Sequence, residues 1–287
     1  VFPSAVGVLM MHSAGNRVAH NHIHDFYYSG ISCGWVWGYA DNVTTDNRIE
    51  FNHIHDLGHG LLSDMGGIYT LGVQPGTVLR GNVIYNVEKC NYGGWAIYLD
   101  EGSSHILVEN NLCFRTSSQP FNQHYGRENI VRNNVFALGR EGQISLGRAE
   151  AHNAFSLLHN IILTDGQPAL VGGYRSPLEG GGRRSDLNLY WDVGGQGVAG
   201  GDRDYDAQAQ IVWPRRYAWD ELQALGYDTH SQMADPQFTA LDLSGAAGLP
   251  FDVSVAPESP ALALGFRPFD LTAAGPRRQT GIASLHR

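Results

Sequence analysis

The chain has 287 residues, of which 43% are hydrophobic, only 16% are charged and 36 are glycines. This hydrophobic content excludes a wholly disordered chain, and the low charge fits neither a coiled coil nor a charged helical protein. A formal net charge of −9 argues against nucleic acid or an anionic membrane as a partner. The sequence contains no apolar run of about 20 residues, so we expect no membrane span.

A six-residue pattern recurs along the first two thirds of the chain: apolar, any, polar, Asn, any, apolar. The intervals between its asparagines are 31, 30, 29, 23, 26 and 28 residues. The seven asparagines are Asn21, Asn52, Asn82, Asn111, Asn134, Asn160 and Asn188. A repeat of this length indicates stacked supersecondary units, and the alternating apolar residues between Gly, Asn and Asp turns favour strands. We predict an all-β parallel β-helix of about seven to eight coils.

The asparagines are expected to stack at one corner of the solenoid, with side-chain amides in a ladder and the backbone in the left-handed conformation. A second apolar strand should follow each of them. In five copies it falls ten residues on, at Ile31, Phe121, Ile144, Leu170 and Val198. In the Asn52 and Asn82 copies it comes later, at Ile68 and Ile97, because each carries an insertion of a few residues.

The repeat divides the chain into two parts. Residues 1–200 are predicted to form the β-helix and to carry the active site, and residues 201–287 to close the solenoid as an irregular segment with one short helix over 217–225. The N-terminus starts within a coil without a visible cap, so we expect a truncated solenoid. No leader peptide is visible either.

Stacking the copies aligns the second strands. Ile31, Ile68, Ile97, Phe121 and Ile144 share an inward position, so Ser32, Tyr69, Tyr98, Asn122 and Ser145 point outward in the next position. Two residues further on stand Gly34, Leu71, Asp100, His124 and Gly147. Adjacent coils lie about 4.8 Å apart, so Asp100 and His124 should be neighbours on one outer face.

Insertions at residues 56–67 and 87–95, and a third after Ile31, lead into this face, and long loops on a rigid scaffold often carry function. We predict that Asp64, Asp100 and Glu101 are catalytic. Paired carboxylates cleave glycosidic bonds when one protonates the leaving oxygen and the other attacks or activates water. The predicted substrate-binding residues are His55, His59, His124, Trp35, Trp37, Tyr69, Trp95 and Tyr98. Aromatic rings suit the apolar faces of sugars.

Plainer interpretations exist for each of these residues. Asp64, Asp100 and Glu101 are also common turn residues, and Trp35 and Trp37 would make a local hydrophobic clamp. The repeated His-Ile-His-Asp sequence at His22 and His53 is expected to be a stack of turn residues. A metal site there is the weaker alternative, because the spacing matches no zinc signature. We predict no metal site and no cofactor, with calcium as the only candidate weighed.

The stretches SDMGGIYTLGVQPGTVLRGNVIYNV, YGGWAIYLDEGSSHILVENNLCF and FNQHYGRENIVRNNVFA resemble right-handed parallel β-helix proteins around glycoside hydrolase family 141. The tail ADPQF followed by SPALALGF is similar to their closing segment. The resemblance implies a right-handed solenoid and an α-L-fucosidase- or xylanase-like hydrolase of complex plant-type glycans. Motifs like DxGGIY and YLDEGSS would hold its carboxylates, here Asp64 and Asp100 with Glu101 adjacent, although Met65 stands where glycine is expected.

Two rival functions remain open. A polysaccharide lyase or epimerase would need a base and a cation or arginine against a uronate, for which Arg127 and Arg148 are candidates. A non-catalytic carbohydrate-binding β-helix would bind glycans without releasing product. In every case the expected partner is a polysaccharide or oligosaccharide, the oligomeric state is left open, and the expected location is secreted or periplasmic.

Overall fold

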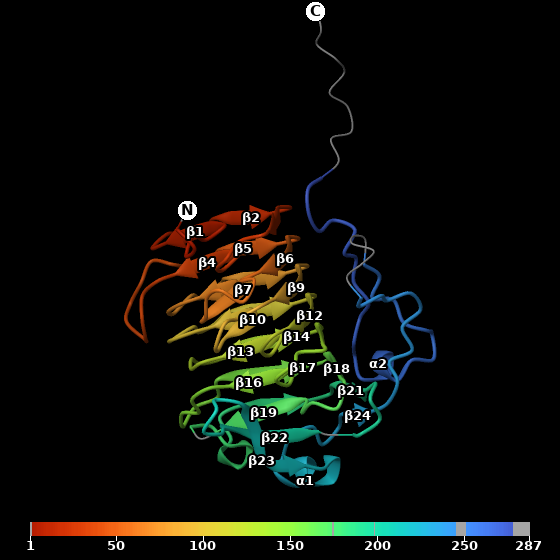
Figure 1. Cartoon of the computed structure of the whole chain (residues 1–287). Coiled ribbons are helices and arrows are strands. Elements are labelled where there is room, and N and C mark those ends of the chain that lie inside the picture. Colours follow the sequence, from red (N-terminus) through yellow and green to blue (C-terminus); the bar gives the residue numbers. More distant parts are fainter. Residues whose placement is uncertain (1, 174, 198, 245–250, 278–287) are drawn as a thin grey trace, which may run out of the picture.

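The computed structural model describes residues 2–173, 175–197, 199–244 and 251–277. Their strands form three sheets that run side by side along a solenoid, as predicted (Figure 1). Each coil contributes one strand to each sheet in turn. We call them sheets A, B and C. In the described residues their strands pair in parallel, except that the last strand of sheet A, β23, returns antiparallel to β22.

Sheet A consists of β1 (Val8–Met11), β4 (Ile31–Gly34), β7 (Met65–Thr70), β10 (Gly94–Leu99), β13 (Phe121–Gln123), β16 (Ile144–Leu146), β19 (Leu170–Gly173), β22 (Gly200–Tyr205) and β23 (Ile211–Tyr217). Sheet B consists of β2 (Arg17–Ala19), β5 (Arg48–Glu50), β8 (Val78–Arg80), β11 (Leu107–Glu109), β14 (Asn129–Arg132), β17 (Phe155–Leu158) and β20 (Arg184–Asp186). Sheet C consists of β3 (His22–His24), β6 (His53–Leu57), β9 (Val83–Val87), β12 (Leu112–Thr116), β15 (Val135–Ala137), β18 (Ile161–Thr164), β21 (Leu189–Asp192) and β24 (Gln232–Met233).

The predicted register of sheet A is confirmed. Ile31 pairs with Ile68, which pairs with Ile97, and the column continues through Phe121 and Ile144. All five of these side chains are fully buried inside the solenoid. The predicted Val198 lies outside the described residues; Leu170 pairs instead with Gly200 at the start of β22. The outward column of Tyr69, Tyr98 and Asn122 therefore lies where the repeat places it.

The asparagine ladder is also confirmed. The Oδ1 atom of Asn111, for example, accepts hydrogen bonds from both the backbone N–H and the side-chain amide of Asn82, at 3.0 and 2.9 Å. The left-handed conformation, however, belongs to the residue before each asparagine, as at His20 (φ 60°), Phe51 (φ 54°) and Gly81 (φ 64°). The preceding residue turns the chain, which leaves the asparagine side chain free to bridge the coils.

The chain after residue 200 covers two parts of the solenoid: its end and the outer face of sheet C. Helix α1 (Trp219–Ala224) places Leu222 against the solenoid core at the end of the last coils. The predicted helix over 217–225 is shorter than expected, because Tyr217 still belongs to β23. The remainder, including helix α2 (Pro260–Ala263), runs back along the outer face of sheet C (Figure 1). A 3₁₀ turn, η1 (Leu178–Gly180), completes the described helices.

The returning segment explains why the outer face of sheet C is apolar. Phe251, Val253, Leu264 and Phe266 pack on outward residues of the sheet such as Phe114. Strands covered on both faces are expected to be apolar on both. The segment therefore lies mainly along the side of the solenoid, while α1 and its neighbours cover the end.

Candidate active site on the outer face of sheet A

The candidate site lies where β7, β10 and β13 adjoin. Tyr69, Tyr98 and Asn122 stand next to one another on the outer face of these strands. Loops 58–64 and 88–93, which hold the two insertions, enter β7 and β10 at this point. The loop 35–47, which we call the aromatic loop, follows β4 and carries Trp35 and Trp37.

Asp100 follows directly after β10 and is held from two sides. The hydroxyl of Tyr69 donates to its Oδ2 atom at 2.6 Å, and Nδ1 of His124 lies 2.9 Å from its Oδ1 atom. The Asp100 side chain is only 8% exposed, whereas 30% of the His124 side chain is exposed. The imidazole is thus the solvent-facing member of this His–Asp pair, and Asp100 orients it.

Asp64 directly precedes β7 and has a left-handed backbone, with φ of 61°. Its counterpart in the next coil is Gly93 (φ 69°), the residue before Gly94, which pairs with Met65. An aspartate thus stands where the neighbouring coil uses glycine, and aspartate is one of the residues that adopt this conformation most readily.

The two carboxyl groups belong to one electrostatic unit. The hydroxyl of Tyr98 donates to Oδ1 of Asp64 at 3.2 Å, and the neighbouring Tyr69 donates to Oδ2 of Asp100. Burial, followed by the charge of Asp100, raises the pKa of Asp64 above its usual value. A carboxyl group whose pKa is raised in this way stays protonated to higher pH, as a general acid must. We call Asp64, Asp100, Tyr69, Tyr98 and His124 the carboxylate cluster.

The predicted aromatic residues gather around this cluster but differ in exposure. The ring of Trp95 packs on Tyr98, with centroids 4.1 Å apart, and Trp35 packs on Tyr69 at 5.4 Å. Trp95, Tyr98 and Tyr69 are buried, so they support the cluster from beneath. Trp37, which contacts Trp35, is 59% exposed and is the predicted aromatic residue most able to face a sugar ring.

Two predicted histidines do not belong to the cluster. His55 lies on β6 in sheet C, where it faces His22 and the residues around Tyr85. His59 lies beside Asp25 and Tyr27, at the corner between sheets C and A. The prediction placed them by their closeness in sequence to Asp64. Each coil turns a corner between β6 and β7, so the residues before the corner lie on another face.

Glu101 lies close to the cluster but turns away from it. Its carboxylate accepts a hydrogen bond from Tyr125 at 2.9 Å, and its backbone carbonyl accepts one from Gly72 at 3.1 Å. These contacts fix Glu101 beneath the aromatic loop and beside Tyr125. We therefore find no contact among the described residues that makes Glu101 a partner of Asp64.

Three residues that contact Asp64 or Trp95 were not predicted from the sequence: Tyr28, Tyr92 and Gln119. The hydroxyl of Tyr28 donates to the carbonyl of Asp64 at 2.9 Å, and the backbone N–H of Asp64 donates to the carbonyl of Tyr92 at 3.0 Å. Gln119 accepts the indole N–H of Trp95 at 3.0 Å. The position of Tyr92 inside an insertion was a usable signal, whereas Tyr28 and Gln119 belong to ordinary turns that periodicity does not distinguish.

A hollow of about 260 Å³ lies on the next coils of sheet A, beyond His124. It is lined by Ser145, Gly147, Arg175, Arg203 and Tyr205, among others. Gly147 adjoins His124 closely: a Cβ atom there would lie 3.2 Å from its ring. One residue that lines the hollow thus contacts His124, although no member of the carboxylate cluster lines it.

Three parallel sheets around a hydrophobic core define a parallel β-helix protein. In this one, insertions build a polar cluster on one outer face. The family model for the right handed beta helix region matches residues 6–173, which is more than half of the chain. The chain belongs to this family. Searches of curated proteins and of solved structures gave no match. None of the described helices is long and apolar enough to cross a membrane.

Proposed function

We propose that this protein is a glycoside hydrolase in which Asp64 is the general acid. The observation that carries the proposal is the meeting of Asp64 and Asp100, 36 positions apart in the sequence, in one electrostatic unit. A raised pKa keeps the Asp64 carboxyl group protonated to higher pH, which is what protonation of a leaving oxygen requires.

The second role belongs to Asp100 together with His124. Because Asp100 is almost buried, a sugar or a water molecule meets His124 first. We propose that Asp100 orients the imidazole, which takes the proton from an attacking water molecule. Tyr69 and Tyr98 hold the two carboxyl groups apart in fixed positions, and Trp37 stacks on the sugar.

Two further points support carbohydrate chemistry. The right-handed β-helix is a fold on which polysaccharide-degrading enzymes occur, although fold alone does not define function. The resemblance of residues 50–140 to glycoside hydrolase family 141 suggests a fucosidase- or xylanase-like activity on a complex glycan. The hollow beyond His124 offers room for neighbouring sugar units.

The test is to purify Asp64→Asn and Asp100→Asn and to assay them against nitrophenyl glycosides and plant cell-wall polymers. Loss of an acid or base typically costs 10²- to 10⁴-fold, so we expect each kcat to fall by at least about 100-fold. Asn tolerates the left-handed backbone at Asp64, so the fold should survive. The exposed Asp165→Asn is the matched control. Near-parental turnover in both cluster variants would refute the proposal.

A lyase or epimerase is the second candidate, and the arginines favour it. Arg175 and Arg203 line the hollow beside His124, and Arg148 stacks over Tyr125, 3.5 Å from its centroid. A uronate carboxylate in the hollow would meet these cations while His124 removed a proton. The same screen decides: a product that absorbs in the near ultraviolet indicates elimination, and a new reducing end without that absorbance indicates hydrolysis.

A further inference from the structure

We propose that His22, His53 and His55, on the outer face of sheet C, bind one divalent transition-metal ion of the zinc type. We call these three residues the histidine cluster. They come from two adjacent strands, β3 and β6, in which His22 pairs with His53 and His24 with His55. Ile23 and Ile54 between them point into the core and are buried, so all the imidazoles point outward.

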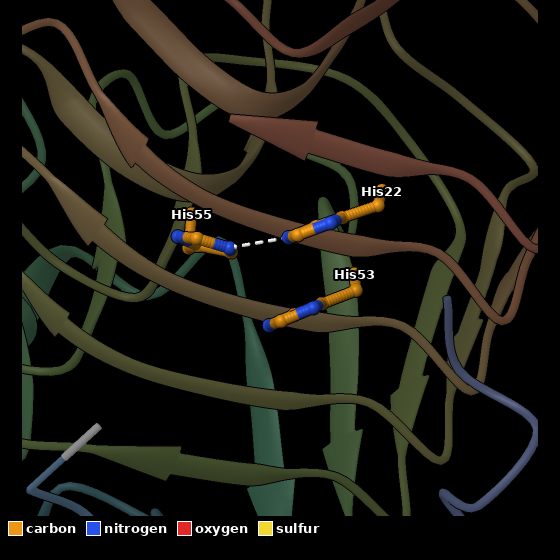
Figure 2. A group of neighbouring side chains, drawn as sticks. All are labelled: His22, His53 and His55. Atoms are coloured by element: carbon orange, nitrogen blue, oxygen red, sulfur yellow. Dashed lines mark hydrogen bonds between the residues drawn. The ribbon is translucent and has the colours of Figure 1, made fainter. Parts of the chain in front are cut away.

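Figure 2 shows the parallel rings of His22 and His53 on one side and His55 opposite them, with His55 pointing toward His22. The Nε2 atoms of His22 and His55 lie 2.7 Å apart, and one ring nitrogen of each of the three residues lies within 4.8 Å of the others. Zinc–nitrogen bonds of about 2.0–2.1 Å in tetrahedral geometry place ligand nitrogens about 3.3 Å apart. Small side-chain rotations, without movement of the strands, would bring the nitrogens to that spacing.

A carboxylate fixes the orientation of the central ligand. Nδ1 of His55 lies 2.6 Å from Oδ2 of Asp56, whose other oxygen accepts a hydrogen bond from Asn86 at 2.8 Å. With its proton on Nδ1, His55 turns the lone pair of Nε2 toward His22. A carboxylate bound to the far nitrogen of a ligating histidine is the usual second layer of a metal site.

The third ligand, His53, has one further polar neighbour. The hydroxyl of Tyr85 lies 3.1 Å from Nε2 of His53 and would hydrogen-bond a water molecule on the metal once that nitrogen is a ligand.

A stacking role alone does not explain why histidine occurs here. The His22 and His53 column continues in the next coils with Val83, Leu112 and Val135, and the His55 column continues with Tyr85 and Phe114. These apolar residues contact the C-terminal segment and complete a hydrophobic layer. Imidazoles replace them in two coils only, where His22 remains exposed and leaves a fourth coordination position open to solvent. Three nitrogen ligands without cysteine suit Zn²⁺, Co²⁺ or Ni²⁺.

The histidines are therefore not turn residues, contrary to the prediction. They are strand residues, and the turn is made by the aspartates that follow, Asp25 (φ 57°) and Asp56 (φ 49°). The missing zinc signature is explained by the fold. Ligands that lie side by side across parallel coils are separated by a whole coil in the sequence, here 31 residues between His22 and His53.

The experiment is a titration of the EDTA-treated full chain with ZnCl₂ by calorimetry, and with CoCl₂ by visible absorption. We expect one ion per chain. We also expect the Co²⁺ complex to show the strong visible absorption bands of a four-coordinate ion. His22→Gln and His55→Gln should each weaken binding by at least about 100-fold, and Asp56→Asn by about 10- to 100-fold. Far-ultraviolet circular dichroism and melting curves verify that each variant is folded.

Two matched controls complete the design. His24→Gln changes the same motif in the same strand but removes no ligand, and His230→Gln removes an exposed histidine elsewhere. Both should bind with close to the parental affinity. An absence of one-to-one binding, or equal weakening by His24→Gln and His22→Gln, would overturn the proposal. Glycan turnover by Asp64→Asn is unaffected by either result, so the two proposals fail independently.

Discussion

The asparagine ladder allows the stability of the solenoid to be tested at a single side chain. In the middle of the ladder, the Asn111 side chain accepts two hydrogen bonds from Asn82 and donates to Leu79, Glu109 and Asn134. Asn111→Ala removes all of them and leaves the buried backbone N–H of Asn82 without its acceptor. An orphaned buried group costs about 1–3 kcal/mol and each lost bond about 1 kcal/mol, so we expect about 3–5 kcal/mol of destabilisation.

Asn21→Ala is the matched control, because Asn21 lies at the end of the same ladder. Its side chain donates to Asn52 and to Ala19, and the described residues show no backbone N–H that depends on it. We expect a loss of about 1 kcal/mol. The assay is urea unfolding followed by circular dichroism and tryptophan fluorescence. Equal destabilisation by the two substitutions would refute the view that the ladder acts by satisfying buried backbone groups.

Two further predictions concern the candidate active site. The raised pKa of Asp64 means that the folded chain holds this proton more tightly than the unfolded chain, so stability is lost as pH rises through the folded-state value. Asp64→Asn should therefore melt higher than the parent at about pH 8 and equally at about pH 3; a lower melting temperature at pH 8 would contradict this. Gly102→Ala should displace the aromatic loop and shift tryptophan emission, because its Cβ would lie 1.9 Å from the Gly38 carbonyl oxygen. Gly15→Ala has a similar φ but open space around it, so an equal effect there would show that backbone strain alone is responsible.

The sequence predicted the columns of sheet A because the repeat carries its own register. Each ladder asparagine bonds to the asparagine of the next coil, so residues at equal distances from it are neighbours in space. The distance of ten residues to the second strand holds only while the corner between the strands keeps one length. The insertions before Ile68 and Ile97 break that count, yet apolar alternation restores the register once the strand begins.

The sequence did not show which sheet, and so which outer face of the solenoid, the residues on each side of a corner belong to. His55 and Asp64 are nine positions apart, but β6 and β7 belong to different sheets, so their side chains point to different sides of the solenoid. The path of the C-terminal segment was missed for a related reason. Outward apolar residues such as Tyr85 and Phe114 were a signal that sheet C is covered, but its covering partner lies more than a hundred residues away.

The three outer faces have different chemistry, and this restricts where a substrate can bind. Sheet B carries a ladder of opposite charges in which Glu50 and Glu109 alternate with Arg80 and Arg132. These ions satisfy one another and offer little to a neutral sugar. Most of sheet C is covered by the C-terminal segment. In the described part of the chain, the outer face of sheet A combines loops, aromatic side chains and a hollow.

The same coils supply both proposed sites, and the solenoid explains how they can. The copies around Asn21 and Asn52 contribute His22, His53 and His55 to sheet C, and the copies around Asn52 and Asn82 contribute Asp64 and Asp100 to sheet A. Each coil contacts only its neighbours, so an outward residue changes without disturbing the inward isoleucines that hold the stack. A metal on sheet C would tie β3 to β6, and β6 leads directly into the loop that carries Asp64.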